Sequence, residues 1–285
     1  SDGPAPPLRR DRARVRVDLR HGVAHEGVTG APDVAGLQNA SQFYQILPYM
    51  EQTAVHNGTP GDTWQTRNRI IRGAAIPTFY CPSKRDPQTY DNNNNSSGRH
   101  YIQDVPRERY PLGMTDYIGA DQSGNSSRLI VDGFFTDSAD LHNAGFRAVD
   151  HGKGVFLHTR NTIATLTLRT IGFSAVRDGT SNTLMIGEKC IHPLHYGNVN
   201  RSSDNWGYVP GNNPDTIGRT DWALLADQEC LAQNLSSTWR FGSSHPSGLN
   251  ILFTDGSVHF IPYTVDRVVF ARMGHRADAR DVKWP

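Results

Sequence analysis

His245 and Asp255 are residue types that carry out acid–base chemistry, and both lie near the end of the chain. They belong to the stretch HPSGLNILFTDGSVHFI (residues 245–261), in which Asp255-Gly256 separates two apolar runs. An Asp-Gly step between apolar runs is typical of a β-hairpin turn. An intervening strand at about 3.3 Å per residue would hold the two side chains roughly 30 Å apart, too far for a hydrogen bond. The sequence therefore predicts that they are not an acid–base pair, and that Asp255 and Gly256 set the hairpin.

The strands of this hairpin have an expected register. If Asp255 and Gly256 alone form the loop, Phe253 lies opposite Val258, and alternate residues of each strand point to the same side. The register predicts one buried apolar face, made by Leu249, Ile251, Phe253, Val258 and Phe260. His245 would lie just before the first strand.

A second polar turn, DGTSNT (residues 178–183), precedes an apolar stretch that ends at Glu188. Its carboxylate and hydroxyl oxygens are ligands that Ca²⁺ accepts, although the spacing is not that of an EF-hand. Side chains in such turns more often bond to the turn's own amides. We expect a structural turn set by Asp178, Gly179, Ser181 and Asn182, with calcium as an open alternative and no metal ligand set assigned.

Charge and motifs restrict the function classes. The chain has 29 basic and 28 acidic residues, which argues against a general nucleic-acid binder. It has no apolar run long enough to span a membrane, no phosphate-binding loop and no nucleophile elbow. A hydrolase would need Asp178, Glu188 and His245 to meet in space. We predict no catalysis, no catalytic residues and no cofactor.

The three cysteines are Cys81, Cys190 and Cys230, and none forms a Cys-x-x-Cys motif. Cys190 and Cys230 flank a polar insertion and are candidates for a disulfide, while three reduced thiols remain the alternative, because pairing cannot be read from sequence.

A ligand-binding surface is the rival to a structural role. Aromatic rings stack on sugars and other flat ligands. The residues available for such a platform are Trp206, Tyr208, Trp222 and Trp239. A carbohydrate- or ligand-binding module, with a glycan as partner, is therefore the second hypothesis.

Periodicity predicts one α+β domain over residues 37–285, preceded by a basic, unpacked arm over residues 1–36. Apolar residues with helical spacing lie in SQFYQILPYMEQ (41–52), where Pro48 is expected to break the helix. Residues 84–105 are polar and Asn-rich, and predict an exposed loop.

The rest of the domain is expected to be an antiparallel sheet with long loops and a short C-terminal helix. Strands are predicted at TDYIGA (115–120) and TLMIGE (183–188), and over 132–137, 152–159 and 162–171. Thr264 and Gly274 are expected to cap the helix.

Five stretches share one resemblance, and they occur in this order: SQFYQILPYMEQ (41–52), IPTFYCPS (76–83), TDYIGA (115–120), VRDGTSNTLMIGE (176–188) and FGSSHPSGLNILFTDGSVHFI (241–261). Together they resemble the DUF1559 family of prepilin-type bacterial proteins, which is abundant in planctomycetes. The last stretch contains the family's H-X9-DG element, at His245, Asp255 and Gly256. The resemblance covers about residues 37–275.

This resemblance implies a pilin-like head in which the N-terminal helical segment packs on the sheet. It implies an extracytoplasmic pseudopilin-like subunit of the cell envelope that assembles with itself or with secretion components. The motif residues, including Cys81, Pro82 and Glu188, would then have structural roles. The apolar N-terminal helix of the family is not recognisable in residues 1–36.

Overall fold

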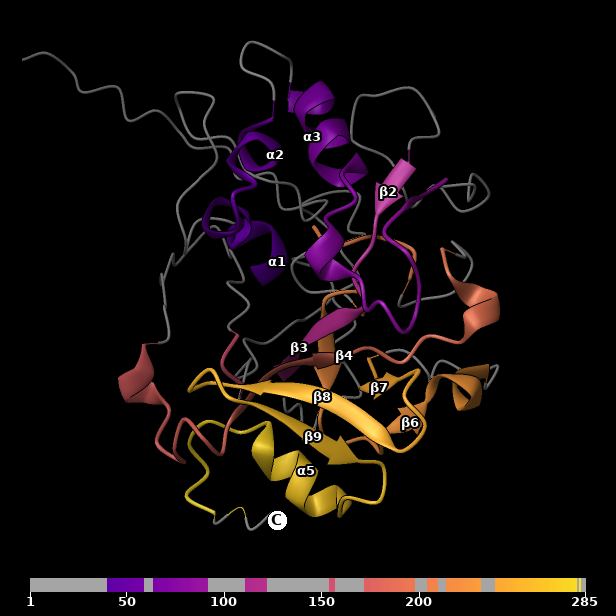
Figure 1. Cartoon of the computed structure of the whole chain (residues 1–285). Helices are drawn as coiled ribbons and strands as arrows, with labels where there is room; N and C mark the ends of the chain where they lie inside the picture. The colour runs from indigo at the N-terminus through magenta and orange to yellow at the C-terminus, as the bar shows by residue number, and fades with distance from the viewer. Residues whose placement is uncertain are drawn as a thin grey trace, which may run out of the picture.

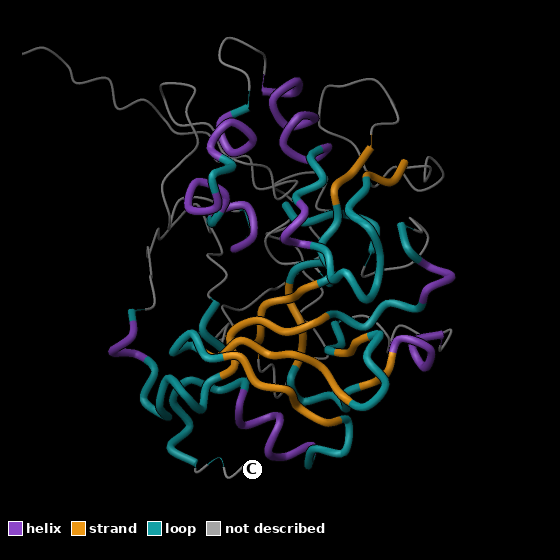
Figure 2. The backbone as a smooth tube through the Cα atoms, viewed as in Figure 1, coloured by secondary structure: helices purple, strands orange, loops and turns teal. Residues whose placement is uncertain are grey.

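The computed structural model describes residues 40–58, 64–91, 111–121, 154–156, 172–197, 204–209, 214–231, 239–280 and 282. The described chain is α+β, as predicted, with short N-terminal helices, a five-stranded sheet and a short C-terminal helix. Figures 1 and 2 show the N-terminal helices gathered at one end of the molecule and the sheet at the other. The predicted arm over residues 1–36 lies outside the described residues, so the domain boundary stays a prediction.

The N-terminal part of the described chain forms short helices: α1 (Gln42–Gln45), η1 (Leu47–Met50), α2 (Thr53–Asn57), α3 (Trp64–Gly73) and η2 (Pro77–Phe79). The Ser41 hydroxyl caps α1 by accepting a hydrogen bond from the Tyr44 N–H at 3.3 Å. Pro48 stands in the first turn of η1, where its missing N–H is tolerated. The predicted break at this proline is confirmed.

The main sheet has the strand order β5-β3-β4-β8-β9. Its strands are β3 (Tyr117–Asp121), β4 (Leu184–Glu188), β5 (Ile217–Arg219), β8 (Gly248–Phe253) and β9 (Val258–Pro262). Strands β3, β4, β8 and β9 pair antiparallel, whereas β3 and β5 pair parallel. The predicted strands at 115–120 and 183–188 are confirmed as β3 and β4, but the sheet is mixed rather than wholly antiparallel.

Smaller elements surround this sheet. The strand pairs are β1 (Thr89–Asp91) with β2 (Pro111–Gly113), and β6 (Leu225–Ala226) with β7 (Gly242–Ser243). The short helices are η3 (Phe173–Ala175), η4 (Pro193–His195) and η5 (Asp227–Leu231). The strands predicted over 132–137 and 162–171, and all but 154–156 of the one over 152–159, lie outside the described residues.

Two apolar clusters cover the two faces of the sheet. The first cluster joins the N-terminal helices to β2 and to the face that carries Tyr117 and Ile186. The second joins the opposite face, which carries Ile118 and Ile251, to α5 (Arg267–Met273). Neighbouring strand residues point to opposite faces, so β3 contributes to both clusters. The prediction that the N-terminal segment packs on the sheet is therefore confirmed.

The predicted hairpin forms between β8 and β9, but its loop is longer than expected. The loop is Thr254–Gly256, closed by a hydrogen bond of 3.0 Å from the Gly256 N–H to the Phe253 carbonyl. Gly256 has φ +89°, which is the left-handed position of a three-residue hairpin loop. The predicted two-residue loop is wrong.

The extra loop residue shifts the register by one. Leu252, rather than Phe253, lies opposite Val258. A one-residue shift turns every side chain of a strand to the other face. The three predicted β8 core residues are fully buried, but Val258 and Phe260 are 62% and 48% exposed.

The two predicted motif turns contact each other. The Asp255 N–H donates to the Thr180 carbonyl at 3.1 Å, and the Thr254 N–H donates to the Thr183 carbonyl at 2.9 Å. Within the first turn, Gly179 has φ +95°, and the side-chain amide of Asn182 donates to the backbone carbonyl of Asp178 at 3.0 Å. Ser181 is exposed. The turns therefore hold the start of β4 against the end of β8.

The C-terminal helix α5 begins later than predicted. The Asp266 carboxylate, not Thr264, caps it by accepting hydrogen bonds from the Val268 and Val269 N–H groups. Aspartate is at least as good an N-cap as threonine, and this one directly precedes the helix. Gly274 follows the helix, as predicted.

Cys190 and Cys230 form a disulfide across 40 residues of sequence, and Cys81 is a buried free thiol. Of the two cysteine arrangements left open by the sequence, the disulfide is the one in the structure.

We predict that Gly256→Val destabilises the protein by about 1–3 kcal/mol, the cost of holding a non-glycine residue in a sparsely populated backbone region. No neighbouring atom lies within 4 Å of an added Cβ, so the effect would come from backbone strain alone. Urea unfolding of both proteins measures it. Gly256→Asn is the matched control, because asparagine tolerates this conformation better. Equal stabilities of wild type and Gly256→Val would contradict the hairpin geometry.

We predict that replacing both Cys190 and Cys230 by serine lowers the free energy of unfolding by about 2–4 kcal/mol, because the cross-link restricts the unfolded chain. Guanidinium unfolding with and without a reductant measures the loss. The reductant should shift the wild-type midpoint and leave the double variant unchanged. A wild type insensitive to the reductant, with the same midpoint as the variant, would show that the disulfide is absent.

Candidate functional site

A tight turn after η2 carries three buried side chains, those of Cys81, Lys84 and Arg85. The Cys81 carbonyl accepts hydrogen bonds from the Lys84 N–H at 2.8 Å and the Arg85 N–H at 3.1 Å. Pro82 occupies the second position of the turn, where its fixed φ is favourable. The prediction of an exposed loop over residues 84–105 is wrong at Lys84 and Arg85, which are buried, and at Thr89–Asp91, which form β1. Residues 92–105 lie outside the described residues.

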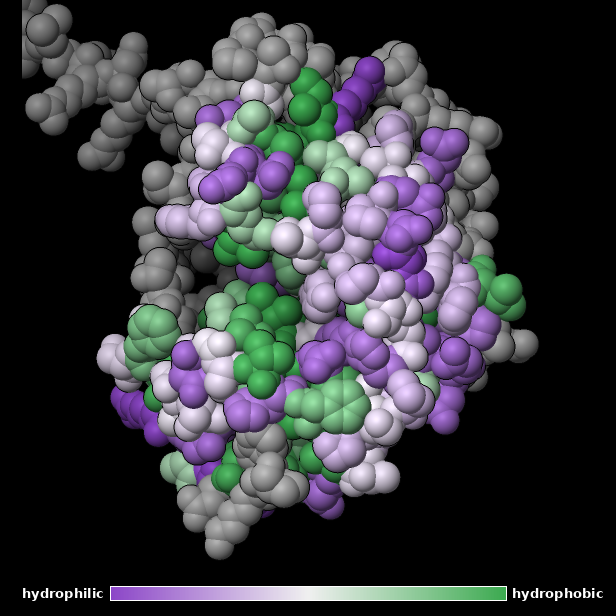
Figure 3. All heavy atoms as spheres, in the orientation of Figure 1, coloured by the Kyte–Doolittle hydropathy of each residue, from purple (hydrophilic) through white to green (hydrophobic). Residues whose placement is uncertain are grey.

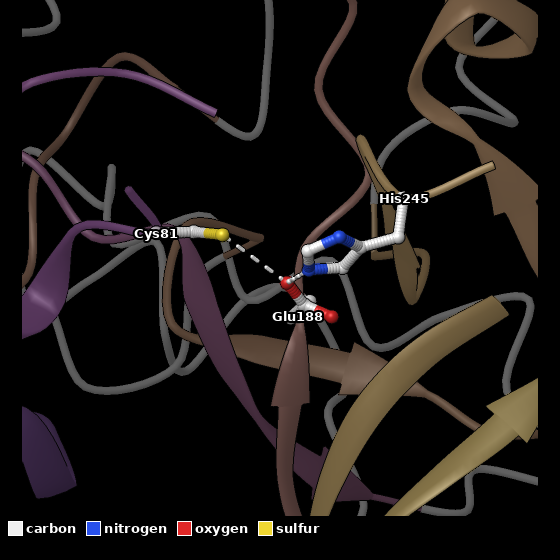
Figure 4. A group of neighbouring side chains, drawn as sticks. All are labelled: Cys81, Glu188 and His245. Atoms are coloured by element: carbon white, nitrogen blue, oxygen red, sulfur yellow. Dashed lines mark hydrogen bonds and ion pairs between the residues drawn. The ribbon is translucent and has the colours of Figure 1, made fainter. Parts of the chain in front are cut away.

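Cys81 meets Glu188 and His245 in a three-residue cluster (Figure 4). The Glu188 Oε1 atom lies 3.3 Å from the Cys81 Sγ and 3.1 Å from the His245 Nε2. Cys81 comes from the turn after η2, Glu188 from the end of β4, and His245 from the segment between β7 and β8. Cys81 and Glu188 are buried, and the His245 side chain is 26% exposed. The cluster therefore opens to solvent on the histidine side.

Backbone contacts hold each member of this cluster in place. The Asn250 N–H donates to the Glu188 Oε2 at 2.7 Å, and the Cys81 N–H donates to an Asp116 carboxylate oxygen at 3.0 Å. The Tyr263 hydroxyl donates to the His245 carbonyl at 2.9 Å. These contacts hold the Glu188 carboxylate and the backbone at Cys81 and His245.

The surroundings do not favour a nucleophilic cysteine. Burial raises the pKa of the Cys81 thiol, and the negative charge of Glu188 raises it further. A thiol attacks well only as a thiolate, which forms where nearby positive charge lowers the pKa. The cluster instead offers one sulfur, one oxygen and one nitrogen atom that converge, and these are metal-ligand types.

Arg85 is the centre of a buried charge network beside this cluster. Its guanidinium makes two hydrogen bonds to Asp204, at 2.6 and 2.9 Å, and an ion pair of 2.6 Å with Asp116. The rings of Tyr80, Tyr90 and Tyr196 lie 4.9–5.5 Å from its central carbon. Burial alone would raise the pKa of the Asp204 carboxyl, but the charge and hydrogen bonds of Arg85 outweigh burial and lower that pKa.

Two lysines extend the network. Lys189, which is fully buried, lies 3.7 Å from Asp204 and donates to the Asp215 backbone carbonyl at 3.3 Å. Burial lowers the pKa of Lys189, against the attraction of Asp215 and Asp204. Lys84 forms an ion pair of 3.1 Å with Asp227 and also donates to the Lys189 carbonyl. Burial raises the pKa of the Asp227 carboxyl.

Sequence reasoning missed this network. Its members were not predicted as a group, because they lie at six separate places in the chain: Lys84 with Arg85, Asp116, Lys189, Asp204, Asp215 and Asp227. Lys84-Arg85 directly after CPS, and Lys189 directly after an apolar strand, were the local signals available.

The three residues that a hydrolase would need, Asp178, Glu188 and His245, are only partly brought together. Glu188 and His245 are in contact, but Asp178 is elsewhere, where its carboxylate accepts hydrogen bonds from the N–H groups of Asp278 and Ala279. Asp178 therefore anchors the C-terminal segment. Asp255 is exposed and accepts from the N–H and hydroxyl of Ser257, which lower its pKa. As predicted, Asp255 is not paired with His245.

One of the four residues predicted to form an aromatic platform is not at the surface. Tyr208 is fully buried in the first apolar cluster, and its hydroxyl donates to the Ile71 carbonyl. Trp206, Trp222 and Trp239 are half-buried, and the guanidinium groups of Arg219 and Arg240 lie 4.6 and 4.8 Å from the Trp222 ring. Tyr208 cannot stack on a ligand at the surface, so the platform as predicted is wrong at this residue.

An exposed apolar surface lies on the face of β9 turned away from α5. Val258 and Phe260 point to the same side as the half-buried Leu252, because of the register described above. Figure 3 shows apolar side chains gathered over this part of the sheet. β9 is the last strand of its sheet, and no strand among the described residues pairs with its outer edge.

Comparison with known proteins places the chain in a family. It belongs to the family described as "Protein of unknown function (DUF1559)", whose model matches residues 22–268. No curated protein and no solved structure matches the chain. Among the described helices, none has both the length and the apolar character of a membrane span.

We predict that Arg85→Met lowers the free energy of unfolding by about 3–5 kcal/mol, because it leaves the buried carboxylates of Asp116 and Asp204 without their cation. Denaturant unfolding measures the loss. Arg219→Met is the control: its partner Asp221 is partly exposed, so we expect a loss of about 1 kcal/mol or less. Similar losses in both variants would show that the network does not depend on Arg85.

Proposed function

We propose that this protein is an extracytoplasmic structural subunit, resembling a pseudopilin head, that assembles with copies of itself and performs no catalysis. The observation that carries this proposal is the exposed apolar face and open edge of β9. An uncovered edge strand presents unpaired N–H and C=O groups to another chain, and soluble proteins usually protect such edges. An apolar face on the same strand adds area that association would remove from water.

The Cys190–Cys230 disulfide supports the location. Structural disulfides form and persist outside the cytoplasm, where the environment is oxidising. Membership of the DUF1559 family, together with the resemblance of its motifs to prepilin-type proteins, supports the kind of assembly.

The β9 surface has the composition of an interface centre. Val258 and Phe260 are large and apolar, and their exposure costs free energy in an isolated chain. Val258 and Phe260 alternate with side chains on the α5 side of the sheet, so a neighbouring copy could cover both without disturbing the core. This geometry favours a second copy of the chain over a small ligand, because the surface is a strand face rather than a cavity.

We predict that replacing Val258 and Phe260 together by lysine abolishes self-association while leaving the fold intact. Lysine on an edge strand opposes pairing with another strand, and exposed substitutions usually change stability by about 0.5 kcal/mol or less. Sedimentation velocity of wild type and variant over a range of concentrations measures the association. Thermal unfolding of the same samples checks the fold.

Leu194→Lys is the matched control, since Leu194 is an apolar residue that is 77% exposed on η4. It should associate like wild type. A wild type that stays monomeric at high concentration, or a loss of association in Leu194→Lys as large as in the β9 variant, would contradict assembly through β9. Glycan binding would then be the next property to test.

A further inference from the structure

We propose that Cys81, Glu188 and His245 form a binding site for a divalent cation of the Zn²⁺ type. Each residue offers one ligand atom, and the three atoms lie within 4.8 Å of one another. The proposal does not depend on assembly through β9, because this cluster and the exposed face of β9 share no residue.

The spacing of the three atoms fits one cation. Zn²⁺ lies about 2.0–2.3 Å from sulfur, nitrogen and oxygen ligands, which places neighbouring ligands of a tetrahedron roughly 3–4 Å apart. The Glu188 Oε1 atom is already 3.3 Å from the Cys81 Sγ and 3.1 Å from the His245 Nε2. Small movements of these side chains would therefore bring all three atoms to bonding distance of one ion. The fourth position would face the partly exposed histidine side of the cluster.

The donor types select the cation. Thiolate and imidazole favour Zn²⁺ and related transition metals, whereas Ca²⁺ and Mg²⁺ prefer oxygen ligands alone. Binding would replace the Cys81 thiol proton, which is released to solvent. Calcium, which the sequence left open for the DGTSNT turn, is not the ion that this cluster fits.

Buried acidic side chains outnumber buried basic ones around the cluster, which favours a bound cation. Near the cluster, five buried carboxylates (Asp116, Glu188, Asp204, Asp215 and Asp227) face three buried cationic side chains (Lys84, Arg85 and Lys189). The second oxygen of Glu188 is held by the Asn250 N–H, which leaves Oε1 for the ion. Contacts of this kind orient metal ligands and strengthen binding.

Two other groups of ligand residues fit a cation less well. In the group Cys190, Asp227 and Cys230, the two sulfur atoms are bonded to each other. In the group Asp178, His275 and Asp278, the Asp178 carboxylate already accepts two backbone hydrogen bonds. Of the groups in the described part of the chain, only the Cys81 cluster contains a free thiol.

A bound cation would join segments that are distant in sequence. It would tie the turn after η2 to the end of β4 and to the segment before β8. The turn after η2 and the end of β4 also meet in the Arg85 network, where Lys84 donates to the Lys189 carbonyl, and the ion would add a direct bond from both to the segment before β8. A ligand that binds only the folded state raises its stability in proportion to the logarithm of ligand concentration.

The test uses the untagged, metal-free chain with its disulfide intact, titrated with Co²⁺ as a spectroscopic substitute for Zn²⁺. Because Cys81 is the one cysteine outside the disulfide, a thiolate-to-cobalt absorption band reports on this residue alone. We expect the band to saturate at about one equivalent and to be displaced by Zn²⁺, which binds the same ligand types. We also expect Zn²⁺ to raise the unfolding temperature.

The variants Cys81→Ser and His245→Gln should each lose the band and the stabilisation by Zn²⁺. His275→Gln is the matched control, because it removes a histidine from the alternative group and should bind like wild type. The proposal is overturned if wild type shows no thiolate band, if the band survives in His245→Gln, or if His275→Gln abolishes it. His245 is partly exposed, so its variant keeps the test valid even if Cys81→Ser folds poorly.

Discussion

Arg85 holds two buried aspartates that come from segments far apart in the chain, and most of the described structure is arranged around this contact. Asp204 is 119 residues away in sequence and Asp116 lies before β3. A buried charge without a partner costs several kcal/mol, whereas a buried ion pair adds little over well-packed apolar residues. The network therefore adds little net stability, but it strongly disfavours any fold in which these charges are buried apart from one another. An arrangement that kept these segments apart would leave the charges of Arg85, Asp116 and Asp204 without partners.

The same network determines where Cys81 lies. One oxygen of Asp116 pairs with Arg85, and the other accepts the Cys81 N–H. The Asp116 carbonyl accepts the N–H of Lys189, the residue after Glu188. Asp116 thus fixes the turn after η2 against the end of β4, and the thiol of Cys81 against the carboxylate of Glu188. The position of the cluster therefore depends on the charge network beside it.

Local signals in the sequence predicted the elements, and the missing information was non-local. The Asp-Gly step identified the hairpin, and Pro48 identified the break between α1 and η1, because both act within a few residues. The register of β9 could not be predicted, since two-residue and three-residue loops both use glycine with positive φ. Choosing between them needs the packing of the neighbouring turn at Thr180 and Thr183, which holds Thr254 and Asp255 by backbone hydrogen bonds.

The site was predictable only as separate residues. Cys81, Glu188 and His245 were each identified from motif stretches, and two of them were considered together, but the contact of Cys81 with Glu188 spans 107 residues. Nothing in the sequence of either stretch indicates that Cys81 and Glu188 are in contact. The partners of Arg85 are equally remote, and an arginine in a polar stretch is normally a solvated one. Burial of such residues is decided by the topology of the sheet, not by their neighbours in sequence.

Strand β8 connects the two surfaces to which we assign roles. One face of it is buried against α5, and the other carries Asn250, whose N–H holds Glu188, and Leu252, which lies opposite Val258 of β9. The side chains proposed to bind a cation and those proposed to contact another copy therefore lie on the same face of the sheet, at opposite sides of this strand.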